Sequence, residues 1–190
     1  WPVAPHLCED AYTVADAVVV GSLLIAFLRH ADRVGSACLA QLVNVIAPIK
    51  TEPRGPAWRE ATFYPFSVTA ARARGEAVPL AVDGPELSTP THGDVPVVDA
   101  VATVEESGAA SLFVVNRHPS ETVELVLDTP RRTAIHLLDA VELSDPDIHA
   151  TNSREQPDRV RPRPMSGHDG SQLRLSLPPV SWSSARLRSR

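Results

Sequence analysis

Apolar residues follow two different patterns along the chain, and the change between them divides the sequence into two parts. From Val14 to Gly75 they form long runs with few polar interruptions, as buried helices and strands do. From Val97 onward, apolar and polar positions alternate with a period of two in short segments, which is typical of half-buried antiparallel strands. The sequence therefore predicts an α/β part followed by an all-β part.

The first predicted helix begins at a capping box. Thr13 and Asp16 are spaced so that each side chain can accept from the other residue's backbone N–H at the helix start. The helix is expected to run to about Arg33 and to leave through Gly35 in a left-handed conformation. Because its middle is apolar on nearly every side, we expect it to be heavily buried.

A buried strand and a second helix are predicted next. Ser36–Ala47 is almost continuously apolar, as in a parallel strand covered on both faces. Pro48–Trp58 is rich in Pro and Gly and predicts a long loop. Pro65–Arg74 predicts a helix, with proline in its first position and Gly75 at its end. Helix, strand, loop and helix amount to about one and a half units of a βα-type fold.

The all-β part is expected to be an antiparallel sandwich made of short strands. Arg117–Thr122 is predicted to join two of these strands as a hairpin, and Ser144–Gly170 to be a long irregular excursion. Trp182, at the start of the last strand, is expected to be buried in the core. The predicted strands are Val78–Val82, Val97–Val104, Ser111–Asn116, Val123–Leu127, Thr133–Leu143, Leu173–Leu177 and Trp182–Leu187.

Composition excludes several classes of protein. The 190 residues carry a net charge of −5, which argues against a nucleic-acid or anionic-membrane partner. The longest apolar stretch, Ala17–Leu28, is about half of the ~20 residues that a membrane span needs, and no signal peptide is recognisable. The two cysteines, Cys8 and Cys38, exclude a disulfide-rich scaffold and are expected to be buried. Because the chain starts at Trp1 and its only Met is Met165, we expect it to be a piece of a longer protein.

Recognisable catalytic motifs are absent. No two of the seven histidines have the spacing of a metal-binding pair, so neither a metal site nor a cofactor is expected. His30 is best explained by the negative end of the helix dipole, and the arginines of the long excursion by a solvated loop. Glu52 follows the predicted buried strand, where an α/β enzyme places its site, but a role in anchoring the loop is favoured.

Gln41 is the strongest candidate for a functional residue. An amide in a strand buried on both faces has up to four hydrogen-bonding positions to satisfy. If the strand belongs to a (β/α)8 barrel, this side chain points into the active site. The alternative is a core glutamine bonded to a neighbouring strand, and the residues alone leave the two equally weighted. Asn44 faces the other way or caps the loop beyond the strand.

Several longer motifs resemble the α-L-arabinofuranosidases of glycoside hydrolase family 51. The most specific is ACLAQLVNVIAPI, residues 37–49, which contains Gln41. It is preceded by LCEDAYTVADAVVVGSLLIAFLRHADRV and followed by TEPRGPAW, FYPF, HGDVP, FVVNRH and LPPVSW. The resemblance therefore covers nearly the whole chain. Cys8 departs from it, where relatives usually carry an aliphatic residue.

The resemblance implies that residues 1–75 are the last portion of a (β/α)8 barrel and that residues 76–190 are an appended β-sandwich of jelly-roll type. It implies a retaining, exo-acting enzyme that removes terminal arabinofuranosyl residues from arabinan and arabinoxylan. Its nucleophile and acid/base glutamates would precede this chain, so no catalytic residue is expected here. Gln41 would hydrogen-bond the arabinose. The complete protein would be a cytoplasmic homo-oligomer that binds no nucleic acid and no membrane.

A second hypothesis from another class stays open. A β-sandwich can also serve as a non-catalytic carbohydrate-binding or oligomerisation module. The chain has only three tryptophans and no aromatic stripe on any predicted strand, which argues against sugar binding by the sandwich. On either hypothesis we expect the chain by itself to hydrolyse nothing.

Overall fold

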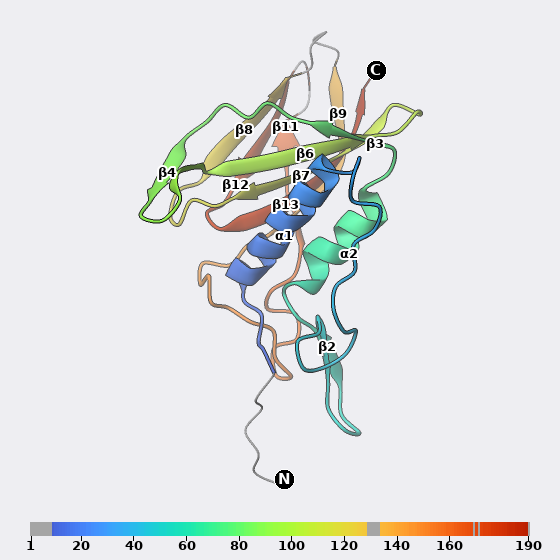
Figure 1. Cartoon of the computed structure of the whole chain (residues 1–190), viewed down its shortest axis with the longest axis vertical. Coiled ribbons are helices and arrows are strands. Elements are labelled where there is room, and N and C mark those ends of the chain that lie inside the picture. Colours follow the sequence, from blue (N-terminus) through green and yellow to red (C-terminus); the bar gives the residue numbers. More distant parts are fainter. Residues whose placement is uncertain (1–8, 129–133, 169, 171, 190) are drawn as a thin grey trace.

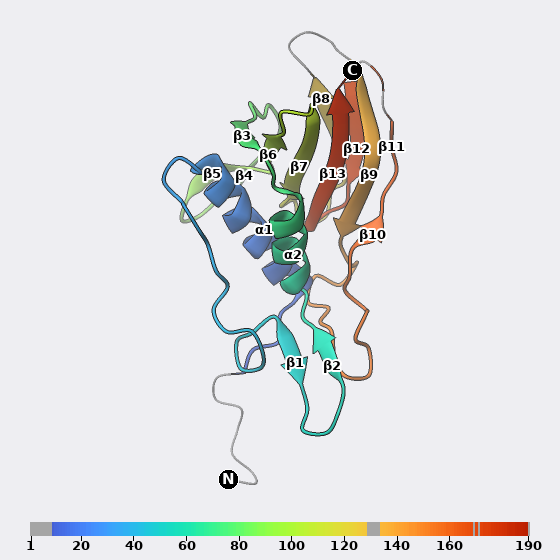
Figure 2. The same cartoon turned by 90° about the vertical axis from the view of Figure 1, so that its right-hand side faces the viewer.

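Two helices cover one face of a six-stranded sheet, and a three-stranded sheet packs on the opposite face (Figures 1 and 2). This arrangement comes from a computed structural model that describes residues 9–128, 134–168, 170 and 172–189. A hairpin of two short strands projects from the end of the molecule where the described N-terminal residues lie. The fold is therefore mostly antiparallel β-sheet with two helices.

The first helix, α1 (Val14–Arg29), begins at the predicted capping box. The Thr13 N–H donates to Asp16 Oδ2 over 2.8 Å, and the Asp16 N–H donates to Thr13 Oγ1 over 3.2 Å. The helix is shorter than predicted, because its C-cap is His30 and a further turn closes when Val34 N donates to His30 O. Gly35 is consequently not the left-handed residue that ends the helix, and that expectation was wrong.

The second helix, α2 (Phe63–Arg72), confirms the predicted position to within two residues. Pro65 lies in its first turn, where an absent N–H removes no intrahelical hydrogen bond. The chain leaves the helix through Gly75, which has a φ of 80° in the left-handed region that favours glycine. The second helix therefore lies two residues earlier than predicted, with Pro65 as its third residue and Gly75 two residues after its C-cap, Ala73.

All strand pairs are antiparallel in the described residues. The large sheet has the order β10-β9-β13-β7-β6-β3, the small one β11-β12-β8, and two hairpins pair β1 with β2 and β4 with β5. The strands are β1 (Ile49–Thr51), β2 (Ala57–Arg59), β3 (Glu76–Pro79), β4 (Glu86–Thr89), β5 (Gly93–Pro96), β6 (Val98–Val104), β7 (Ala109–Asn116), β8 (Val123–Asp128), β9 (Ile135–Leu143), β10 (Arg163–Pro164), β11 (Gly167–His168), β12 (Gln172–Leu177) and β13 (Ser181–Ser189).

The predicted sandwich is confirmed, but one of its connections is wrong. Residues 117–122 do not form a hairpin, since β7 lies in the large sheet and β8 in the small one. The side chain of Asn116, at the end of β7, donates to Glu121 O within this segment and to Leu177 O at the end of β12, each over 3.0 Å. Period-two patterns locate strands but not their partners, so the sequence could not distinguish a hairpin from a crossing between sheets.

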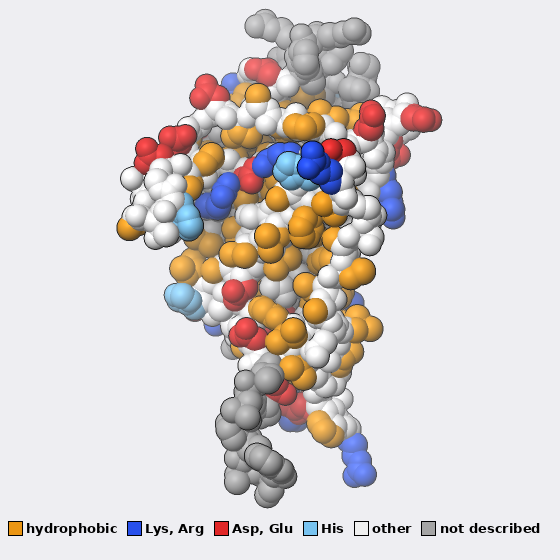
Figure 3. Space-filling view, in the orientation of Figure 1, with side chains coloured by type: hydrophobic (Ala, Val, Ile, Leu, Met, Phe, Trp, Pro, Cys, Tyr) orange, Lys and Arg blue, Asp and Glu red, His pale blue; other side chains and the backbone are white. Residues whose placement is uncertain are grey.

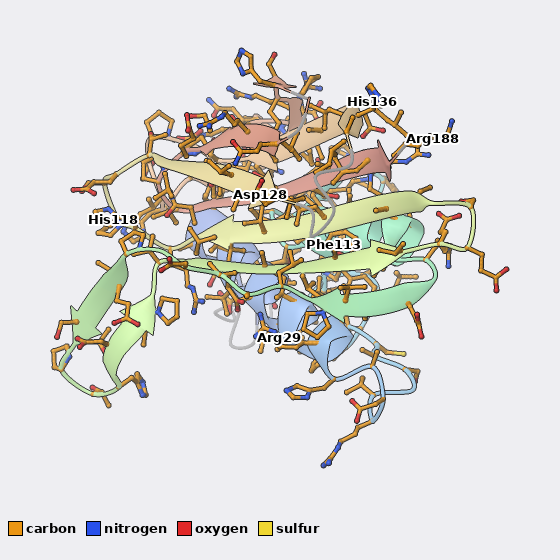
Figure 4. All side chains as sticks on the ribbon, turned by 90° about the horizontal axis from the view of Figure 1, so that it is seen from above. Arg29, Phe113, His118, Asp128, His136 and Arg188 are labelled. Carbon is orange, nitrogen blue, oxygen red and sulfur yellow. The ribbon has the colours of Figure 1, made fainter. Side chains whose placement is uncertain are left out.

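The large sheet is covered on both faces, which creates two cores. Trp182, Phe113, Val14 and Ile25 pack between this sheet and the helices; Figure 4 shows Phe113 in that layer. Leucines of β12 and the opposite face of β7 fill the space between the two sheets. β7 therefore has a continuous apolar run although it is antiparallel. Trp182 is fully buried, as predicted.

The segment that connects β9 to β10, residues 144–162, is tied to the start of α1. Val14 N donates to Ala150 O and Ala15 N to Ile148 O, both over 3.1 Å. These are N–H groups of the first helical turn, which have no partner inside the helix. The predicted irregular segment, residues 144–170, is thus irregular up to residue 162, but it is hydrogen-bonded to the start of α1. After residue 162 it contains the short strands β10 and β11.

Candidate functional site

The residues between α1 and β1 form an irregular loop, residues 31–48, in place of the predicted buried strand. Most side chains of 36–46 are exposed, and Leu42 reaches 71%. Gln41, Asn44 and Val45 have φ of 59°, 62° and 54°, which no β-strand contains. The prediction of a strand over Ser36–Ala47 was therefore wrong for this chain. A parallel strand needs neighbours to accept its hydrogen bonds, and no strand of the described residues pairs with this loop in a sheet.

The irregular loop also decides two other expectations, for the cysteines and for Asn44. Cys38 is exposed, because the strand that would have buried it is absent, and Cys8 lies outside the described residues. Asn44 caps the loop: Thr51 N donates to Asn44 Oδ1 over 2.7 Å, and Asn44 Nδ2 donates to Thr51 Oγ1 over 2.9 Å. Asn44 thus has the loop-capping role, one of the two predicted for it.

Gln41 is exposed on this loop and is not in a strand. Its Oε1 accepts a hydrogen bond from Ile46 N over 3.4 Å. Beside it lies a hollow of about 550 Å³ between the loop and α2, with Phe63, Phe66 and Leu42 among its walls. Gln41 therefore supplies a polar group at the edge of an apolar hollow.

A second hollow, of about 470 Å³, lies between β2 and the 144–162 segment. Trp58, Arg59 and Tyr64 line one side and Pro157 and Asp158 the other. Below we call it the Trp58 hollow. It combines aromatic rings with two opposite charges, and its walls come from distant parts of the sequence.

Glu60 lies behind the Trp58 hollow and holds the Trp58 ring. The sequence did not indicate this role. The Glu60 side chain is only 2% exposed, and it accepts hydrogen bonds from Trp58 Nε1 and Tyr12 N, each over 3.1 Å. Burial raises the pKa of this carboxyl, while the two hydrogen bonds and the charge of Lys50 oppose the rise. Glu60 follows a tryptophan in a polar stretch, so no sequence signal distinguished it from a solvated acid.

Asn152 was also missed. It is buried, and its Nδ2 donates to Arg59 O and Val160 O over 2.7 and 2.8 Å, while its Oδ1 accepts from Val160 N. A polar side chain in an irregular segment gives no periodic signal. Only the meeting of this segment with β2 makes Asn152 a structural residue.

Glu52 has the anchoring role favoured by the sequence. Its carboxylate pairs with Arg154 of the 144–162 segment over 2.7 Å. This ion pair joins the β1–β2 hairpin to the 144–162 segment. Arg154 is the first arginine of the predicted solvated run, and another, Arg159, pairs with Asp147 over 3.1 Å.

An apolar surface extends along the outer side of α1, contrary to the expectation that this helix is buried on nearly every side. Val19 and Leu23 are 58% and 52% exposed, and Phe27 is 40% exposed. Figure 3 shows hydrophobic side chains gathered over the middle of this face. The opposite side of α1 packs on the sheet, where Arg29 pairs with Asp99 of β6 (Figure 4). One face of the helix therefore presents partly exposed apolar side chains to solvent.

Comparison with known families identifies the chain. Residues 1–181 match the family described as the α-L-arabinofuranosidase C-terminal domain. The chain belongs to this family.

Known α-L-arabinofuranosidases align with almost all of the chain. It is 49% identical, over 98% of its length, to an intracellular exo-α-(1→5)-L-arabinofuranosidase of Streptomyces lividans. It is 46% identical, over 99% of its length, to an exo-α-(1→6)-L-arabinofuranosidase of Bifidobacterium longum. The chain spans only 28% and 37% of the lengths of these two relatives.

Solved α-L-arabinofuranosidases share the fold. A family 51 enzyme from Bifidobacterium longum superimposes with a TM-score of 0.89 and 43% identity, covering 99% of this chain and 39% of that one. The enzyme from Xanthomonas axonopodis pv. citri has the same fold, with a TM-score of 0.85 at 24% identity. The antiparallel sheets and two helices are therefore those of the α-L-arabinofuranosidase C-terminal domain.

The described part of this α-L-arabinofuranosidase C-terminal domain contains neither a metal-binding cluster nor a membrane-spanning helix. No group of three or more His, Cys, Asp or Glu side chains is placed to hold a metal ion there. Among the same residues, no helix has the length and apolar content that crossing a membrane requires.

Proposed function

We propose that the complete protein containing this chain is an exo-acting α-L-arabinofuranosidase that releases terminal arabinofuranosyl residues from arabinan- or arabinoxylan-type saccharides. The observation that carries this proposal is the 49% identity, over 98% of the chain, to an enzyme named for that activity. Because a 46% identical relative is named for a different linkage, the proposal concerns the terminal arabinofuranosyl group and not the bond that holds it.

Residues 1–75 are proposed to complete a (β/α)8 barrel, with residues 76–190 as the appended sandwich. The exposed apolar face of α1 and the exposed side chains of the 31–48 loop support this division. Leaving Leu42, Val43 and Ile46 in water is unfavourable, and neighbouring barrel strands would cover them. On this proposal the loop takes up its strand conformation only when the upstream strands supply hydrogen-bonding partners.

Gln41 is proposed to bind the terminal arabinose. In a completed barrel, a polar side chain near the carboxyl end of a strand faces the active site. The amide group carries both donors and acceptors, which suits sugar hydroxyls. Supporting this role, the Gln41 side chain is exposed, and it accepts a long hydrogen bond, 3.4 Å, from Ile46 N within its own loop.

The catalytic pair is proposed to lie upstream. Retaining hydrolysis needs one carboxylic acid to protonate the leaving oxygen and one carboxylate to attack the sugar. Within the described residues, the most buried carboxylate is Glu60, and it is engaged by Trp58 and Tyr12. Glu52 is engaged by Arg154. This chain is thus proposed to supply substrate contacts and not the acid or the nucleophile.

The test is to compare the complete protein with residues 1–190 alone on an aryl α-L-arabinofuranoside and on arabinan. The complete protein should release arabinose from both, and the chain alone should release none. If the complete protein binds arabinan without hydrolysing it, the proposal fails and the chain belongs to a carbohydrate-binding module. Turnover by the chain alone would show that the catalytic residues lie within it and not upstream. Glu52→Gln would then be the first variant to examine.

The complete protein is further proposed to be a cytoplasmic homo-oligomer. For the location, the support is that relatives 49% and 45% identical to the chain are named intracellular enzymes. For the assembly, the exposed apolar side chains of α1 offer an association surface, in competition with the barrel. Sedimentation of the complete protein measures its assembly directly.

A further inference from the structure

The Trp58 hollow is separate from Gln41 and has walls that do not include it. One wall is β2 with the start of α2, and the other is the tip of the 144–162 segment. Phe63 and Tyr64 are neighbours at the start of α2, and Phe63 lines the Gln41 hollow whereas Tyr64 lines the Trp58 hollow. The two hollows therefore adjoin the same first turn of α2.

The ring of Trp58 is fixed in its orientation. Its Nε1 donates to Glu60 Oε1 over 3.1 Å, and Glu60 is itself buried and held by Tyr12 N. The tryptophan is only partly buried, and its exposed part lines the hollow. A rigid aromatic ring offers a large contact area at little entropic cost on binding, since no rotamers remain to be lost.

Two opposite charges border this ring. Arg59 is exposed, with its guanidinium carbon 4.9 Å from the centre of the Phe63 ring, and Asp158 is exposed on the facing wall. An anionic ligand would be repelled by Asp158, and a cationic ligand by Arg59. A neutral ligand with many hydroxyl groups can donate to the carboxylate and accept from the guanidinium.

The two walls are also joined directly by a hydrogen bond and an ion pair. Asn152 Nδ2 donates to Arg59 O over 2.7 Å, which joins the two walls near their base. Arg154 and Glu52 form an ion pair over 2.7 Å at the outer side. A hollow braced at both sides needs little rearrangement to bind, as ligand sites generally do.

We propose that the Trp58 hollow is a second saccharide subsite, which binds a sugar residue of the arabinose-containing chain away from the bond that is cleaved. The apolar C–H face of that sugar stacks on Trp58, and its hydroxyls bond to Arg59 and Asp158. This inference rests on the proposed function, because it takes the sugar from that substrate.

The test uses the complete protein with three variants, Trp58→Ala, Asp158→Ala and the control Glu155→Ala. Glu155 is exposed on the same segment and does not line the hollow. Each is assayed on an arabino-oligosaccharide of several units and on an aryl α-L-arabinofuranoside, which has no further sugar residue for the subsite to bind. Trp58→Ala should raise KM for the oligosaccharide about tenfold and Asp158→Ala about threefold, with the aryl substrate changed less than about twofold.

Glu155→Ala should match the unsubstituted protein on both substrates. An equal loss on both substrates for Trp58→Ala and Asp158→Ala would show a structural role, and no loss on either would show that no sugar binds there. Each result overturns the subsite. If the unsubstituted protein hydrolyses neither substrate, the proposed function has failed, and calorimetric titration with the oligosaccharide decides the subsite. Binding lost in Asp158→Ala but kept in Glu155→Ala would support it, and absence of binding would overturn it.

Discussion

The indole of Trp182 on β13 lies directly against the backbone of Gly21 on α1. A Cβ atom placed on Gly21 would overlap the Cδ1 atom of this ring. The helix approaches the sheet this closely because position 21 has no side chain, and six buried residues of α1, Gly21 among them, form its inner face. The contact joins the two parts of the chain, since Gly21 belongs to the predicted α/β part and Trp182 to the sandwich.

Gly21→Ala is expected to destabilise the chain by about 1–3 kcal/mol, because the methyl group forces the helix or the indole to move. In an unconstrained helix the same change would stabilise, since Ala is the better helix former. Urea unfolding of residues 1–190 measures the difference. Gly35→Ala is the matched control, because no atom lies within 4 Å of its added Cβ. A neutral or stabilising Gly21→Ala would contradict this packing.

Trp182→Ala should cost about 3–5 kcal/mol, as for a large buried aromatic residue. Trp182→Phe should cost clearly less. The indole Nε1 is buried and has no hydrogen-bond partner among the described residues, so phenylalanine loses packing but no hydrogen bond. Chemical denaturation of the two variants checks the order. Equal losses in both would mean that the indole N–H has a partner of its own.

Gln41→Ala in the complete protein should lower kcat/KM for arabinofuranosides by the equivalent of about 1–3 kcal/mol, the range for a hydrogen bond lost in the transition state. The thermal unfolding temperature should not change, because on the proposed placement this side chain faces the active site and not the core. Leu42→Ser is a useful companion, since it removes an exposed apolar side chain from the same loop. Unchanged kinetics with a lower unfolding temperature for Gln41→Ala would instead indicate a core glutamine.

Glu60 should make stability depend on pH. Burial raises its pKa in the folded state, so the folded state binds the proton more tightly than the unfolded state does. Its contribution to the free energy of unfolding is therefore greatest below the unfolded pKa. It declines as the pH rises through that value to the folded pKa.

Glu60→Gln removes this titration and keeps a similar shape. The difference in unfolding free energy between the natural chain and Glu60→Gln should shift in favour of the glutamine variant as the pH rises above the ordinary pKa of a glutamate. Comparing two chains cancels other titrating groups, including Glu142, whose pKa burial also raises. A difference that does not change with pH would contradict the assignment to Glu60.

The sequence determined the elements whose signals are local. Thr13 and Asp16 placed the start of α1, and Pro65 with Gly75 placed α2. Alternation placed β8 and β12, because one face of each is exposed and the other lies on the core. The motif around Gln41 was distinctive enough to indicate the family, which the alignment of residues 1–181 confirms.

Only the tertiary structure decided which elements meet. An apolar run such as Ser36–Ala47 indicates that a segment prefers burial, but neighbouring strands must be present before it can become a strand. The same limit explains the crossing between β7 and β8, which depends on which sheet each strand joins. It also explains why Glu60 and Asn152 were missed. Asn152 donates to Arg59 O of β2, and Glu60 accepts from Tyr12 N, 48 residues earlier in the chain. No local pattern encodes contacts between residues so far apart in sequence.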